Sequence, residues 1–172
     1  RGSFDPSTNT ITALKDADLS TMLHEMGHYF FETDISLATE LSALPFVSKG
    51  EQAIIDDVSA LFTWHGIQGD IHDQLNQWHS MSFEEKRSYH EKTAESFEHY
   101  LLTGKAPSLE LQRAFQTFRS WLLGFYKSIK DFIKAHPQAG TLSPEVRAVF
   151  DRMLASEEQI KLAEQGRSMM PL

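Results

Sequence analysis

Hydrophobic residues recur every three to four positions along most of the chain, which is the spacing of one face of an α-helix. The first such segment is expected to begin at Asp18 or Ser20 and to end near Thr33. Its apolar stripe comprises Leu19, Met22, Leu23, Met26 and Phe30. Residues 9–14, with the sequence NTITAL, alternate instead in the manner of a short β-strand. The pattern predicts a mainly α fold with a short N-terminal strand or small sheet.

Capping residues and helix breakers indicate where the later helices begin and end. Ser48 with Glu51, and Ser82 with Glu85, have the spacing of capping boxes, and Gly104 is a typical C-terminal stop. We therefore expect helices over residues 48–62, 71–78, 82–103, 108–135, from 144 onward, and from 156 to about 166. The longest of these is expected to bury Leu111, Phe115, Phe118, Leu122, Phe125, Ile129 and Phe132.

Composition limits the kind of protein that these helices can build. The 172 residues suffice for one domain with a real core, and 41% of them are hydrophobic. Because the chain has no cysteine, disulfides and thiolate metal ligands are excluded. The formal net charge of −8 and the lack of a basic stripe argue against a nucleic-acid partner, and no apolar run is long enough to span a membrane. Since the chain begins RGSFDP, we expect it to be a fragment of a larger protein.

The clearest chemical signal is the pentapeptide HEMGH at residues 24–28. Residues four apart lie one turn apart on a helix, so His24 and His28 can direct ring nitrogens to one ion. Glu25 is rotated by about 100° from His24, which suits a general base that deprotonates a zinc-activated water. Two histidines on one helix face can also be accidental. The capped amphipathic helix and the mid-helix Gly27, which would admit a second backbone closely, favour the zinc site.

A catalytic zinc site needs a third protein ligand and one open position. The residues after His28 do not supply a third histidine at the expected spacing, so the helix over 82–103 is the best source. Glu91 is our first choice, because the small Ala94 one turn later allows close helix packing. Glu95 is the runner-up, and Asp34 is a weaker candidate. Glu95 or Glu98 would serve as an outer hydrogen-bond partner of a ligating imidazole.

HEMGH followed downstream by an E-x-x-A-E helix resembles the gluzincin pattern of zinc metallopeptidases. The segments ADLSTMLHEMGHYFF, HEKTAESFEHYLLTGKAPS and LSPEVRAVFDRMLA resemble the small metallopeptidase domains of very large multidomain phage and prophage proteins. The resemblance runs from about Phe4 to Ile160. It implies a single zincin-like domain over 1–172, bound Zn²⁺ and peptide hydrolysis. It also implies further domains in a parent protein, and a location in the bacterial cytoplasm or delivery by phage.

Other residues leave alternatives open. His65, His72 and His79 recur every seven residues, but Gly66 and Gly69 interrupt the helix, so a second metal site is disfavoured. An oxyanion donor could come from His90, His99, Tyr89 or Tyr100, among which the sequence does not choose. The alternative function is a zincin-shaped interaction module whose metal is structural or lost. A mainly helical domain also has few strand edges with which an extended peptide substrate could pair.

Overall fold

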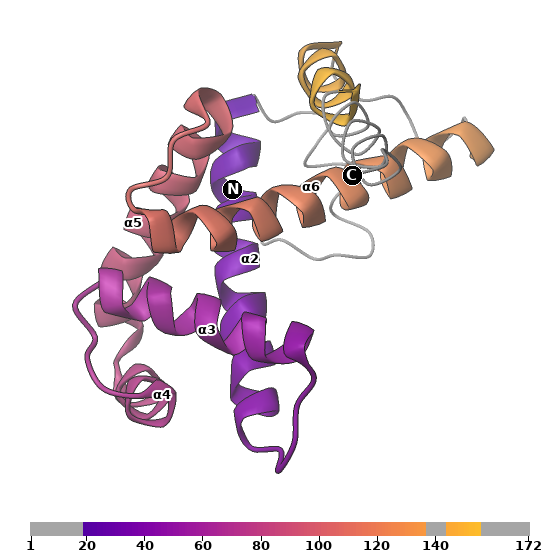
Figure 1. Cartoon of the computed structure of the whole chain (residues 1–172). Coiled ribbons are helices and arrows are strands. Elements are labelled where there is room, and N and C mark those ends of the chain that lie inside the picture. The colour runs from indigo at the N-terminus through magenta and orange to yellow at the C-terminus, as the bar shows by residue number, and fades with distance from the viewer. Residues whose placement is uncertain (1–18, 137–143, 156–172) are drawn as a thin grey trace, which may run out of the picture. The chain divides into compact units, whose positions relative to one another are not determined.

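A computed structural model describes residues 19–136 and 144–155, and every described element is a helix. The helices are α2 (Leu19–Ser42), α3 (Lys49–Trp64), α4 (Ile71–Ser80), α5 (Phe83–Thr103), α6 (Leu109–Ala135) and an unlabelled helix over 144–155 (Figure 1). The mainly α prediction is confirmed. The predicted strand at 9–14 and the helix after Ser156 lie outside the described residues.

The described residues belong to two compact units. Residues 20–120 form one unit, which contains the HEMGH segment, and the described residues from Trp121 onward belong to the other. In the second unit Tyr126 of α6 stacks on Phe150 with ring centroids 4.9 Å apart, and its hydroxyl donates to Asp151. Whether the chain is one functional domain stays a prediction.

Within the first unit α2 contacts each of the other helices through two adjacent aromatic side chains. Phe30 packs against Phe97 of α5 and Phe118 of α6, with ring centroids 6.1 Å and 5.8 Å apart. Phe31 packs against Phe62 of α3 and Trp78 of α4. All of these rings are nearly or fully buried. Aromatic pairs at such distances add to the burial of apolar area, so this cluster fixes α2 at the centre of the unit.

The predicted capping box of α3 and the predicted C-terminal stop of α5 are confirmed, whereas only the Ser82 half of the box predicted for α5 is formed. Ser48 and Glu51 form a reciprocal capping box, Ser82 accepts from the amide of Glu85, and Gly104 ends α5 in the left-handed conformation at φ 75°. Such a φ favours glycine, because other side chains clash there with the backbone.

Two expectations about the helices were wrong. α2 continues nine residues beyond Thr33 to Ser42, because Ile35 and Ala38 extend its buried face past the polar Asp34. On α6, Phe132 is 45% exposed whereas Tyr126 is buried. A strict 4-3 spacing drifts around a helix that has 3.6 residues per turn, so the far end of the predicted stripe left the buried face.

Candidate metal centre

The HEMGH residues lie on the second and third turns of α2, where His24 and His28 share one face. Their rings are 4.9 Å apart between centroids and nearly perpendicular, and each side chain is 24% exposed. The buried neighbours Met22, Leu23 and Met26 hold the opposite face of this segment in the core. The helix therefore presents both imidazoles at the edge of the unit.

Glu91 of α5 faces both imidazoles. One carboxylate oxygen lies 2.9 Å from His24 Nε2, and the other lies 3.1 Å from His28 Nε2. Among the described residues these three form the one group whose ligand atoms could hold a metal, all within 4.8 Å of one another. The structure thus brings the predicted His24, His28 and Glu91 together, while their role as ligands stays a prediction.

The donor types of this group are ones that zinc takes. Zinc takes imidazole nitrogens and carboxylate oxygens at about 2.0–2.2 Å, so two ligand atoms at tetrahedral angles lie about 3.3 Å apart. The two nitrogen–oxygen distances, 2.9 Å and 3.1 Å, run to different oxygens of Glu91, and the ligand atoms taken one from each residue lie within 4.8 Å of one another. The side chains would therefore move slightly inward to hold one ion. Three protein donors also leave one of four tetrahedral positions open, as catalytic sites require.

Gly27 and Ala94 bring the two site helices into close contact, as the sequence predicted. A Cβ added at Gly27 would lie 2.9 Å from the Cα and 3.3 Å from the Cβ of Ala94. Ala94 is itself fully buried. Because Ala94 follows Glu91 by one turn of α5, this backbone contact positions the Glu91 carboxylate opposite the two histidines.

We expect Gly27→Ala to destabilise the protein. Alanine gains about 1 kcal/mol of helix propensity over glycine, but overpacking against the Ala94 backbone costs about 1–3 kcal/mol. The free energy of unfolding should fall by about 1 kcal/mol in denaturant titration. Gly124→Ala is the matched control, because Gly124 is an exposed α6 glycine with no described atom within 4 Å of an added Cβ. That control should gain about 0.5–1 kcal/mol; equal gains in both variants would contradict the close contact.

The surroundings shift the pKa values of His28 and Glu91 below their ordinary values. Burial is the largest influence on the His28 imidazole and leaves its pKa below the ordinary value, which favours the neutral ring. Burial acts to raise the pKa of Glu91, but hydrogen bonds with His24 and His28, and the charge of these rings when they are protonated, outweigh it and lower that pKa. A neutral imidazole beside an ionised carboxylate is the donor pair that a divalent cation needs.

Glu25, the predicted general base, is half-buried next to the two histidines. It makes no hydrogen bond or ion pair with the part of the chain that the structure describes. Its charge acts on His28, whose pKa it raises slightly against the effect of burial. A carboxylate beside the histidines, yet not engaged with them, is available to accept a proton from water.

An outer pair of residues was not foreseen from the sequence. His90 Nδ1 lies 3.2 Å from His28 Nδ1, and His90 Nε2 lies 2.5 Å from a carboxylate oxygen of Glu32. Glu32 follows His28 by one turn of α2, and His90 directly precedes Glu91 on α5. The one available signal was this spacing, since a glutamate four residues after a ligating histidine shares its helix face.

The other acidic candidates lie elsewhere. Glu98 accepts a hydrogen bond from Ser20 at the beginning of α2, away from the imidazoles' Nε2 atoms. Asp34 is 2% exposed, and burial together with the charge of Asp57 raises its pKa to about 8. Arg113 of α6 donates to Asp57 at 2.7 Å. Asp34 therefore belongs to a buried carboxyl pair rather than to the histidine group.

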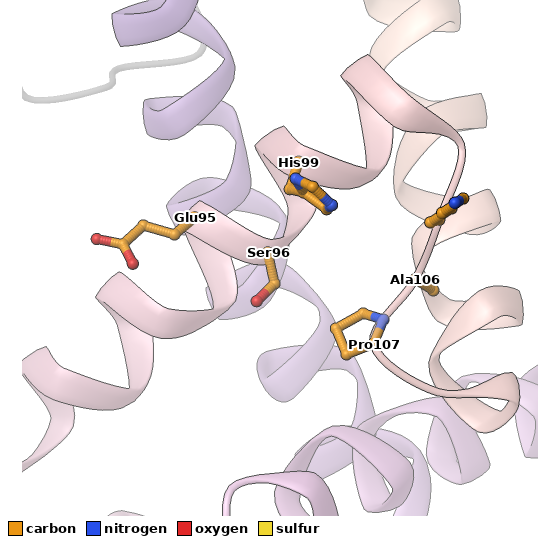
Figure 2. A pocket seen from close by; sticks show the side chains of 6 residues that line it. Glu95, Ser96, His99, Ala106 and Pro107 are labelled. Atoms are coloured by element: carbon orange, nitrogen blue, oxygen red, sulfur yellow. The ribbon is translucent and has the colours of Figure 1, made fainter.

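Glu95 lines a shallow surface pocket of about 360 Å³ instead of joining the group. Figure 2 shows Ser96 and His99 of α5 near Ala106 and Pro107 of the following loop, with the Glu95 carboxylate pointing away from that loop. Lys105 also lines this pocket. Glu95 thus lies one turn from Glu91 but contributes no atom to the histidine group.

Three further histidines, at positions 65, 72 and 79, lie outside the group. His65 Nε2 lies 2.6 Å from Thr93 Oγ1, and burial lowers its pKa to about 3. His79 Nε2 lies 3.1 Å from Thr39 Oγ1, and His72 is exposed. No second metal-binding group occurs among the residues that the structure describes. Two of the four candidates for the oxyanion donor are engaged elsewhere: Tyr100 is buried, and His90 is held between His28 and Glu32. The oxyanion donor therefore stays unassigned.

Comparisons of the chain with protein-family models, curated proteins and solved structures returned no match. In the described ranges no helix is both long enough and apolar enough to cross a membrane.

Proposed function

We propose that this protein is a zinc-dependent metallopeptidase, in which His24, His28 and Glu91 hold the metal and Glu25 is the general base. The observation that carries the proposal is the meeting of these three donors within 4.8 Å, although Glu91 is more than 60 residues from the histidines. If the two histidines shared a helix face by accident, there would be no reason for a carboxylate to lie at hydrogen-bond distance from both rings, as Glu91 does. The HEMGH pattern supports the choice of a hydrolytic zinc site over a purely structural one.

A zinc ion held by His24, His28 and Glu91 would polarise a carbonyl oxygen as a Lewis acid and would lower the pKa of a water molecule. Glu25 orients that water and accepts its proton as the oxygen attacks the carbonyl carbon of the peptide. The same carboxyl then gives the proton to the amine nitrogen as the carbon–nitrogen bond breaks. Met22 and Met26 anchor this turn in the core, so Glu25 keeps a fixed position relative to the histidines.

Within the described part of the molecule, side chains rather than strand edges would contact a substrate. No strand occurs there, so an extended peptide has no sheet edge to pair with. Resemblance to domains of multidomain phage and prophage proteins further suggests a peptide or protein substrate and additional domains in a parent chain. An interaction module with a structural metal remains the competing proposal; it predicts zinc binding without hydrolysis.

Glu91→Gln and Glu95→Gln form a matched pair that tests the third ligand. Both glutamates are exposed on α5 and four residues apart, and the substitution removes the same charge. Loss of a ligand should weaken zinc more than the 10–100-fold typical of an outer partner, so we expect more than about 100-fold for Glu91→Gln. Glu95→Gln should change affinity by less than about 3-fold.

Competition with a zinc chelator measures both variants against the unsubstituted protein. The reverse order of affinities would assign the ligand to Glu95 and would require α5 to shift by about one turn and to rotate by about 40°. Equal affinities in both variants and the unsubstituted protein would remove α5 from the site.

A further inference from the structure

The nitrogen of His28 that faces away from Glu91 has a partner whose chemistry restricts the proton positions in the site. His28 Nδ1 lies 3.2 Å from His90 Nδ1, with ring centroids 5.3 Å apart and the planes tilted by 31°. Two bare ring nitrogens cannot hydrogen-bond, so one of this pair carries a proton and the other accepts it. Which of the two donates determines whether the opposite nitrogen of His28 is free.

Glu32 sets the direction of that bond when a metal occupies His28 Nε2. An ionised carboxylate only accepts hydrogen bonds, so His90 Nε2, at 2.5 Å from Glu32, must be the protonated nitrogen. The hydrogen bond with His90 is the largest influence on Glu32 and lowers its pKa, which keeps the carboxylate ionised. A neutral His90 that carries its proton on Nε2 presents a bare Nδ1. When a metal takes His28 Nε2, the His28 proton lies on Nδ1 and donates to this bare nitrogen of His90. Without a metal, His28 Nε2 lies 3.1 Å from a Glu91 oxygen and can donate to it instead.

We propose that Glu32 and His90 are positioning residues, which fix the tautomer and ring orientation of His28 so that its Nε2 lone pair points to the metal. This inference rests on the proposed metal site and adds to it a two-residue relay between α2 and α5. Ligating histidines commonly donate their second ring nitrogen to a carboxylate. Here the imidazole of His90 lies between the two groups, so the Glu32 carboxylate acts on His28 through His90.

The packing of His90 supports a fixed orientation. Its ring contacts Phe31 and Trp78, with centroids 5.0 Å and 5.8 Å away, and its side chain is 15% exposed. Phe31 and Trp78 are fully buried core residues. The aromatic core thus holds His90 on one side while Glu32, which is 52% exposed, holds it at the solvent edge.

Zinc affinity of four variants tests the relay, measured by chelator competition. Glu32→Ala should weaken zinc by about 10–100-fold, whereas Glu40→Ala should not, although it removes the same charge from an exposed position of α2. His90→Phe keeps a ring against Phe31 and Trp78 but has no nitrogen, and it should weaken zinc by about 10–100-fold as well. His90→Asn can return an oxygen acceptor near the Nδ1 position and should recover most of the affinity.

A spectroscopic measurement separates this role from general packing. In the zinc-loaded protein, ¹⁵N NMR of the histidine rings should show the His28 proton on Nδ1 and the His90 proton on Nε2. A doubly protonated His90, or metal on His28 Nδ1, would overturn the relay. So would Glu32→Ala and His90→Phe variants that bind zinc as tightly as Glu40→Ala. If the unsubstituted protein binds no zinc, the metal site itself fails, and the relay fails with it.

Discussion

Glu25→Gln is expected to retain the fold and the zinc but to lower peptide hydrolysis by about 10²–10⁴-fold, the usual contribution of a general base. Glutamine has nearly the size of glutamate, and the adjacent core residue Met26 is 1% exposed and unchanged. His24, His28 and Glu91 remain, so the metal should stay. The change removes only a carboxylate that has no hydrogen-bond partner among the described residues. Cleavage of a broad peptide library, zinc content and thermal unfolding measure the three properties.

Glu40→Gln is the control for that experiment, since it makes the same change at an exposed position of the same helix. The control should cleave as the unsubstituted protein does. Loss of zinc from Glu25→Gln would make Glu25 a ligand and reassign the mechanism. Cleavage at the unsubstituted rate would place the base elsewhere. Zinc binding without any cleavage by the unsubstituted protein would favour the interaction module.

Much of the helical fold could be predicted because its signals are local. The Ser48–Glu51 capping box and the Gly104 stop depend on residues within one turn of each helix end, and both are confirmed. The end of α2 could not be predicted from the sequence. The buried residue Asp34 is polar, so it interrupts the apolar pattern from which the helix was predicted. Its burial depends on α3, which supplies Asp57 more than 20 residues later.

The residues of the candidate site also fall into those that local sequence predicts and those that depend on how the helices pack. HEMGH places two histidines and a glutamate within five residues, so α2 alone brings them together. Glu91 could be selected because Ala94 marks a face of α5 that packs closely, and the Gly27–Ala94 contact agrees with that choice. The pairing of His90 with Glu32 could not be predicted, since it depends on the register between α2 and α5. A partly exposed glutamate usually indicates only a solvated helix face.

His24→Ala should abolish stoichiometric zinc binding. The substitution leaves two of three protein ligands, and the remaining Glu91 carboxylate loses the imidazole 2.9 Å away that helps to orient it. The fold should persist, because the Phe30 and Phe31 contacts that centre α2 do not involve His24. Elemental analysis before and after exposure to a chelator gives the metal content. His72→Ala is the matched control, since it removes an exposed histidine of α4 that lies outside the group.

Thermal unfolding provides an independent readout of the same change. A ligand that binds only the folded state stabilises it by about 2.7 kcal/mol at one hundred times its dissociation constant. Added zinc should therefore raise the unfolding temperature of the unsubstituted protein and of His72→Ala, but not that of His24→Ala. A folded His24→Ala protein that retains one zinc per chain would show that α2 does not hold the metal. The Glu25 mechanism would then lose its basis, because that carboxylate has a catalytic position only beside a metal on His24 and His28.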